Sequence, residues 1–247
     1  MPTPLVWTEA FRVRAYEVGP GDLATPLSVV NYFQEAAGVH ARALGIERFD
    51  LGEAGAAWVL ARLAVSFGRL PRWRESVTVE TWPSGRDGLR ATRDLLLKDA
   101  DDAILARART VWFVLDLARR RPARLPPAVL DIEPPDRDDA LALESSPTPP
   151  ADPDSSRTFD LRRSDLDRNE HANNARFVDW ALEAVDRAPA RLVSVDIAFK
   201  EEAVFGDTVV SEAGAVGTRA VGTGAVSHAI FRQSDRHLLA TARTRWT

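Results

Sequence analysis

A polar stretch at residues 165–177, DLDRNEHANNARF, holds the side chains best suited to chemistry. Asp167, Asn169 and His171 alternate along it, so on an extended backbone we expect them to point the same way. An amide and an imidazole at this spacing could bind and polarise a carbonyl group, and the carboxylate could orient them. The plainer alternative is that these residues only cap the following helix and turn the chain.

The residues that follow predict that helix. Asn173 and Asn174 are both suitable N-caps, since a short side-chain amide satisfies the first backbone N–H groups. Phe177, Ala181 and Val185 then recur at helical spacing, and Pro189 marks the end (the Pro breaks the pattern). Backbone N–H groups near the two asparagines are candidate donors for a developing oxyanion.

Composition excludes several other chemistries. The chain has no cysteine among its 247 residues, which excludes a thiol nucleophile, a disulfide framework and a cysteine zinc site. Its four histidines, at positions 40, 171, 228 and 237, lack the spacing of zinc ligands. We expect neither a metal nor a cofactor. His40 is expected on the flank of a helix without a partner, and His228 and His237 on the surface.

Charge and hydropathy indicate a cytoplasmic protein that binds neither membrane nor nucleic acid. No apolar run approaches the length of a membrane span. The first residues lack the charged and apolar regions of a targeting signal. The net charge of −4 is not that of a nucleic-acid binder.

The first 130 residues predict a strand, a long helix and four antiparallel strands. Thr25 and Pro26 begin the predicted helix, and its apolar stripe continues until a stop near Gly45. Turn signals at residues 86–88 and 99–102 separate strands. The strands are expected at residues 11–18, 58–67, 76–82, 89–98 and 104–116.

Residues 131–156 read as a linker, and the pattern of elements then repeats. The linker has a net charge of −7 and six prolines, whereas residues 1–130 carry 18 basic and 15 acidic side chains. Residues 157–247 predict a short strand, the helix from Asn174 and four strands beginning near residues 192, 208, 224 and 237. Residues 105–112 match residues 239–246, and Phe67 matches Phe199, at similar offsets, which argues for internal duplication.

We therefore predict an α+β fold, a tandem or double hotdog. Each half is expected to be a curved antiparallel sheet around one long helix, which buries its apolar stripe on the sheet. A lone module of this kind has a sheet edge to cover, and fusion lets two modules form a pseudo-dimer within one chain. A homodimer of the whole chain is a further option.

Motifs along nearly the whole chain resemble those of the acyl-ACP thioesterases, in a bacterial form without a transit peptide. The first half carries YEVG at 16–19, NYFQEAAGVH at 31–40, GLRATRDLLLKD at 88–99, ARARTVWFVLD at 106–116 and RRRPARLP at 119–126. The second half carries DLDRNEHANNARFVDWALE at 165–183 and DIAFKEEA at 196–203.

The resemblance implies hydrolysis of the thioester between a fatty acyl chain and acyl carrier protein, which ends chain elongation. It implies that Asp167, Asn169, His171 and Glu202 are the catalytic residues. Ala203 stands where the plant enzymes have cysteine, so either a carboxylate acts or the protein is inactive. Glu202 is expected to activate water and His171 to orient or donate a proton, with Asn169 bonding the carbonyl or the water. Direct attack by Glu202, through an anhydride, is the alternative.

The first half lacks such residues, with Leu70 in the place of Glu202. Resemblance implies that it shapes the acyl pocket, for which Val29, Val30, Phe33 and Trp58 are lining candidates; simple core packing is equally consistent. Its net positive charge suggests carrier docking on residues 119–121.

Two alternative functions remain. One is an acyl-CoA thioesterase, with an arginine cluster for the coenzyme's phosphates, and the other is a non-catalytic acyl- or carrier-binding protein; a hydratase is a weaker alternative. The arginines considered for those phosphates are at positions 69, 72, 74 and 119–121.

Overall fold

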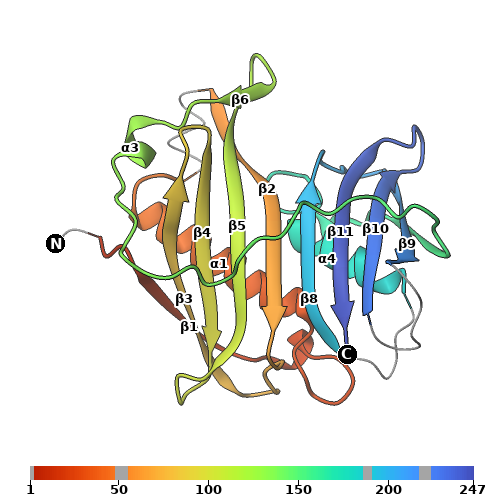
Figure 1. Cartoon of the computed structure of the whole chain (residues 1–247), viewed down its shortest axis with the longest axis horizontal. Coiled ribbons are helices and arrows are strands. Elements are labelled where there is room, and N and C mark those ends of the chain that lie inside the picture. Colours follow the sequence, from red (N-terminus) through yellow and green to blue (C-terminus); the bar gives the residue numbers. More distant parts are fainter. Residues whose placement is uncertain (1–2, 48–54, 186–190, 217–223) are drawn as a thin grey trace. The chain divides into compact units, whose positions relative to one another are not determined.

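The structure is a computed structural model that describes residues 3–47, 55–185, 191–216 and 224–247. The chain divides into two compact units, Met1–Ala142 and Leu143–Thr247. Each unit contains antiparallel strands against which one main helix packs (Figure 1). This arrangement confirms the predicted α+β double hotdog.

In the first unit, helix α1 (Pro26–Ala43) lies on a sheet with the strand order β1-β3-β4-β5-β2. A short strand, β6, pairs with β5, and helix α3 (Pro127–Leu130) follows it. Figure 1 shows α1 behind this sheet. The strands are β1 (Trp7–Arg12), β2 (Ala56–Phe67), β3 (Ser76–Arg86), β4 (Arg90–Lys98), β5 (Ile104–Asp116) and β6 (Arg121–Ala123).

In the second unit, helix α4 (Asn174–Glu183) lies on a sheet with the strand order β8-β11-β10-β9-β7. All neighbours are antiparallel. The strands are β7 (Ser155–Asp160), β8 (Leu192–Phe199), β9 (Thr208–Ala215), β10 (Gly224–Arg232) and β11 (Leu238–Trp246).

Both helices begin where their caps predict. The side chain of Thr25 accepts the N–H of Ser28, and Pro26 occupies the first turn, where its missing N–H costs nothing. Asn173 is the N-cap of α4, and its side chain accepts the N–H of Ala175. The apolar faces are buried: Val29, Val30, Phe33 and Ala36 in α1, and Phe177, Val178, Trp180 and Ala181 in α4. Pro189, expected to end α4, lies outside the described residues.

The first strand differs from the prediction of residues 11–18. It begins at Trp7 and ends at Arg12, and a short 3-10 helix, η1 (Ala15–Glu17), replaces its second half. The cause is local: the carboxylate of Glu17 accepts the backbone N–H of Arg14, which closes the chain into a turn. The alternation of apolar and polar residues there reflects that turn rather than a strand.

Two histidines lie in places that the sequence did not indicate. His40 was expected on a helix flank without a partner, but it is fully buried; its Nδ1 accepts from Arg93 at 2.9 Å and its Nε2 donates to the carbonyl of Pro4 at 3.0 Å. His228 was expected on the surface, but it is fully buried and its Nε2 lies 2.9 Å from the hydroxyl of Thr244. His237 is exposed in a turn, as expected.

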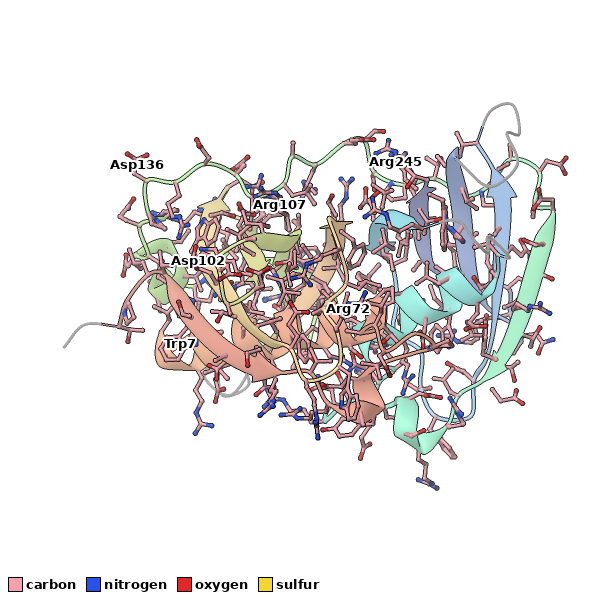
Figure 2. The ribbon with its side chains drawn as sticks, turned by 90° about the horizontal axis from the view of Figure 1, so that it is seen from below. Trp7, Arg72, Asp102, Arg107, Asp136 and Arg245 are labelled. Atoms are coloured by element: carbon pink, nitrogen blue, oxygen red, sulfur yellow. The ribbon has the colours of Figure 1, made fainter. Side chains whose placement is uncertain are left out.

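The acidic Pro-rich segment packs against each sheet on the face opposite its helix (Figure 1). In the first unit, Asp139 pairs with Arg109, which also holds the buried Asp94. In the second unit, Glu144 accepts from both terminal nitrogens of Arg245, which Figure 2 shows beside this segment. The segment is thus ordered by ion pairs to the outward faces of the sheets.

The internal duplication is visible in the register of the strands. Phe67 of β2 is the partner of Ala106 in β5, and Phe199 of β8 is the partner of Ala240 in β11. These are the positions that the sequence repeat relates. Each pair is followed by the same turn, in which two successive N–H groups donate to the carbonyl of Leu105 or Leu239.

Candidate active site

The stretch from Asp167 to His171 is a tight turn rather than the extended segment that the alternation predicted. The N–H of Asp167 donates to the carbonyl of His171 at 2.8 Å, and the N–H of Glu170 donates back to Asp167 at 3.1 Å. Glu170 has a positive φ of 63°, which this closure requires. The polar side chains therefore gather around a turn, because its backbone folds back on itself.

Asp167 organises this turn. One of its carboxylate oxygens accepts the N–H of Asn169 at 2.7 Å and that of His171 at 3.4 Å. Its other oxygen accepts from the side-chain amide of Asn169 at 3.1 Å. A carboxylate that accepts several hydrogen bonds holds its donor groups firmly in position. Asp167 thus orients the Asn169 amide directly, whereas it reaches His171 only through the backbone.

Glu202 reaches the same place from a different part of the chain. It lies three residues beyond Phe199, where β8 ends, in the connection to β9. Two contacts bring that connection to the turn: His171 forms an isolated bridge with Val204, and the N–H of Ala172 donates to the carbonyl of Ala203 at 2.8 Å. The bridge places the imidazole beside the glutamate.

The Nδ1 atom of His171 lies 3.5 Å from Oε2 of Glu202. The two side chains are 39% and 49% exposed, so both are open to solvent and to a substrate. A carboxylate and an imidazole at this distance can share a proton through a small movement, which is the geometry that acid–base chemistry needs. The structure therefore brings all four residues predicted from the sequence into one loop region of the second unit.

Glu201 has a different partner from its neighbour. Its carboxylate pairs with Nε2 of His237, in the turn between β10 and β11. Both glutamates lie beyond the end of β8, so the alternation of a strand is not the reason they diverge. The reason is that separate loops supply their partners, the turn of His171 for Glu202 and the turn of His237 for Glu201.

One of the expected oxyanion donors is already occupied. The N–H of Asn173 donates to the carbonyl of Asp165 at 2.9 Å, and that of Ala175 donates to the Asn173 side chain at 2.9 Å. The first N–H within the helix, on Asn174, is the remaining member of this group. Among the described residues, no cluster of three or more His, Cys, Asp or Glu side chains is arranged to hold a metal ion.

The first unit has the same loop with different side chains. Asp22 has a positive φ of 59°, as Glu170 has in the second unit, and Leu23 forms a bridge with Arg72 as His171 does with Val204. Leu23 therefore stands where His171 stands, and Leu70 where Glu202 stands. The described residues of this loop have no carboxylate and imidazole pair, so the four polar side chains meet in one of the two copies.

Sequence reasoning missed the residues that hold Glu202 in place. Arg232, at the end of β10, donates from Nη2 to the carbonyl of Glu202 at 3.3 Å. Asp207 accepts the N–H of Val204 at 2.9 Å and pairs with Arg232. No motif could have indicated them, because an arginine at a strand end and an aspartate in a turn are common on protein surfaces.

Comparison with known proteins supports one family along the chain. The model of the acyl-ACP thioesterase N-terminal domain matches residues 4–132, and that of the C-terminal domain matches residues 149–247. An acyl-[acyl-carrier-protein] hydrolase of Cuphea viscosissima is 29% identical over 98% of this chain. The chain spans 63% of the length of that protein.

Solved structures share the fold. An acyl-ACP thioesterase from Bacteroides thetaiotaomicron superposes with a TM-score of 0.87 at 22% identity, over 98% of each chain. The 12:0-ACP thioesterase from Umbellularia californica superposes with a TM-score of 0.83 at 24% identity, over 99% of this chain and 98% of the other. With family models matched to both halves, the chain belongs to the acyl-ACP thioesterase family.

Proposed function

We propose that this protein hydrolyses the thioester of fatty acyl-acyl carrier protein and releases the free fatty acid. The observation that carries the proposal is the approach of His171 Nδ1 to within 3.5 Å of Glu202 Oε2, in a loop that also holds Asp167 and Asn169. A thioester carbonyl is activated, so a positioned base for water, a donor to the oxyanion and a proton for the thiolate suffice. Membership of the acyl-ACP thioesterase family supports this substrate class.

In this mechanism Glu202 takes a proton from water, and the resulting hydroxide attacks the thioester carbonyl. When the C–S bond breaks, His171 gives a proton to the departing thiolate and receives through Nδ1 the proton that Glu202 took from water. Asn169, whose amide plane is set by Asp167, donates to the carbonyl oxygen or to the attacking water. The N–H of Asn174, the first residue of α4, is the candidate backbone donor to the oxyanion.

Glu202 could instead attack the carbonyl itself and form an anhydride, which water then opens. The exposure of its carboxylate is compatible with both routes. No thiol can take that part, because Ala203 follows Glu202 and the chain has no cysteine.

The remaining roles in the proposal concern the first unit. It would form the acyl pocket and dock the carrier, while the second unit performs the chemistry. Three of the lining candidates, Val29, Val30 and Phe33, are buried on the apolar face of α1, and Trp58 is half-buried with its indole N–H donating to the carbonyl of Ile46. Fatty acid biosynthesis, a cytoplasmic location and a homodimer stay predictions. No described helix is long and apolar enough to span a membrane.

The experiment that tests the proposal compares turnover of matched acyl-ACP and acyl-CoA substrates by the wild-type protein. Release of free fatty acid from acyl-ACP, with a higher kcat/KM than from acyl-CoA, is the expected result. A preference for the coenzyme A ester would point to an acyl-CoA thioesterase. Binding of acyl-ACP without turnover would point to a non-catalytic carrier-binding protein.

A further inference from the structure

Glu202 lies in a connection of eight residues between β8 and β9 that no regular element holds. Its side chain is 49% exposed, and its contact with His171 is at the long end of hydrogen-bond range. A base in such a segment needs its backbone fixed from elsewhere, since catalysis falls steeply when a reacting group is displaced.

The guanidinium of Arg232 contacts this segment at two points, Glu202 and Asp207, and also contacts Asp235 in the turn after β10. Nη2 donates to the carbonyl of Glu202 at 3.3 Å, Nε lies 3.3 Å from the carboxylate of Asp207, and Nη1 donates to Asp235 at 3.0 Å. Arg232 is the last residue of β10, a central strand of the second sheet, so the donor is anchored in regular structure. Its side chain is 21% exposed, which limits competition from water.

Asp207 fixes the backbone on the C-terminal side of Glu202. Its Oδ2 atom accepts the N–H of Val204 at 2.9 Å as well as the Arg232 Nε–H. Val204 is the residue that pairs with His171. Arg232 and Asp207 therefore fix the backbone on both sides of Ala203, and with it the separation between Glu202 and the imidazole.

The contact with Asp235 reaches the neighbouring glutamate. Asp235 also accepts the N–H of His237 at 3.0 Å, and His237 pairs with Glu201. One guanidinium thus ties the turn that holds Glu201 to the segment that carries Glu202. This keeps the two adjacent carboxylates apart, each with its own imidazole.

We propose that Arg232 is a positioning residue for catalysis, which holds Glu202 opposite His171 through the Glu202 carbonyl and through Asp207. The inference rests on the proposed function of Glu202 as the base. Arg232 touches neither substrate nor the reacting atoms in this account. Its role is to set the direction of the Glu202 side chain by fixing the peptide on which it is carried.

The first unit provides a matched control. Glu75 accepts the N–H of Arg72 at 2.8 Å, as Asp207 accepts that of Val204, and it pairs with Arg69. This is the equivalent turn of the other copy, in which Leu70 replaces Glu202. Loss of the Glu75 carboxylate removes similar bonds, but from a loop with no base to position.

The test measures kcat, KM and thermal unfolding for Arg232→Ala, Arg232→Lys, Asp207→Ala and Glu75→Ala in the full-length protein with acyl-ACP. Arg232→Ala is expected to lower kcat by about 10–100-fold with KM within about twofold, since misplacement affects the reacting groups and not acyl binding. Asp207→Ala should follow in the same direction. Arg232→Lys should recover part of kcat, because an ammonium can pair with Asp207 but cannot span three acceptors. Glu75→Ala should keep kcat.

An Arg232→Ala protein that keeps its kcat would overturn the inference while leaving the proposed function in place. So would a Glu75→Ala protein that loses kcat as severely, since the effect would then be one of general stability. If Arg232→Ala does not fold, Arg232→Lys decides: an unchanged kcat overturns the inference. A wild-type protein without turnover would instead overturn the proposed function, and this inference with it.

Discussion

Leu70 and Glu202 occupy the same position in two copies of one loop, each three residues beyond a phenylalanine at the end of a strand. The backbone around them is alike, down to the paired donation to Leu105 or Leu239 and the bridge that follows. The duplication has therefore conserved a loop geometry, while the side chains have diverged. The chemistry that we propose belongs to the copy with the carboxylate.

Glu202→Gln is expected to reduce kcat for acyl-ACP by about 10²–10⁴-fold while the fold and substrate binding persist, because shape and hydrogen-bonding capacity survive but the base is lost. Glu201→Gln should be nearly silent, because Glu201 pairs with His237 and not with His171. Steady-state kinetics and the melting curve of both variants give the answer. If neither variant lowers kcat, neither carboxylate is the base. If only Glu201→Gln lowers kcat, Glu201 and not Glu202 is the base.

His171→Ala should also lose activity, and the double variant with Glu202→Gln should lose far less than the product of the single losses. Residues that act as one unit are not additive, since the first change already disables the step that the second serves. The two side chains meet at 3.5 Å, which makes such coupling the expected result. A double-mutant cycle on kcat measures it, and fully multiplicative losses would show that the residues act independently.

The contacts of Arg119 show which side chains should be changed to test carrier docking on residues 119–121. It pairs with Asp116 at 2.9 Å, so Arg120 and Arg121 are the side chains to change. Arg120→Asn with Arg121→Ser should raise KM for acyl-ACP and leave a small thioester unaffected; asparagine suits the positive φ of 50° at position 120. The increase should shrink at high salt, as for exposed charges. Equal effects on both substrates would argue against docking there.

The second unit should depend on residues before the predicted boundary at 157. Thr241 donates to the carbonyl of Pro147 at 3.0 Å, Glu144 holds Arg245, and the N–H of Asp154 donates to Ala213 at 2.9 Å. A fragment of residues 157–247 is predicted not to be a stable monomer, and residues 143–247 should unfold at a higher temperature. The four lost hydrogen bonds, two of them in an exposed ion pair, correspond to about 2–4 kcal/mol. Equal, cooperative melting of the two fragments by calorimetry would contradict this.

Stability should fall on acidification because of His40. Burial, and then the positive charge of Arg93, lower the pKa of His40 from 6.5 to about 4. Between those values the unfolded chain binds the proton and the folded chain does not, so unfolding becomes easier as pH falls from about 6.5 to about 4. The full effect is at most about 3 kcal/mol.

His40→Gln provides the comparison for this effect. The variant should be less stable at neutral pH, but its free energy of unfolding should change less with pH in that window, because glutamine does not titrate. Denaturant titrations of both proteins at several pH values measure the two slopes. Parallel slopes would assign the acid sensitivity to other groups.

The sequence by itself determined the fold class, the duplication and the identity of the four polar residues. Period-two alternation, turn residues and helix caps are local signals, and strands β2 to β5 and the starts of both helices follow them closely. Asp167, Asn169 and His171 were found together because they are close in the chain, and Glu202 because the family motif includes it.

Tertiary structure decided what those residues contact. His40 and His228 have partners on other elements, Arg93 on β4 and Thr244 on the neighbouring strand β11, and both are buried. The polar stretch at residues 165–171 closes into a turn because Asp167 bonds amides within it, which alternation alone could not distinguish from a strand. Arg232 reaches Glu202 across 30 residues, and no local pattern encodes such a distance; it exists only once β10 and the β8–β9 connection lie side by side.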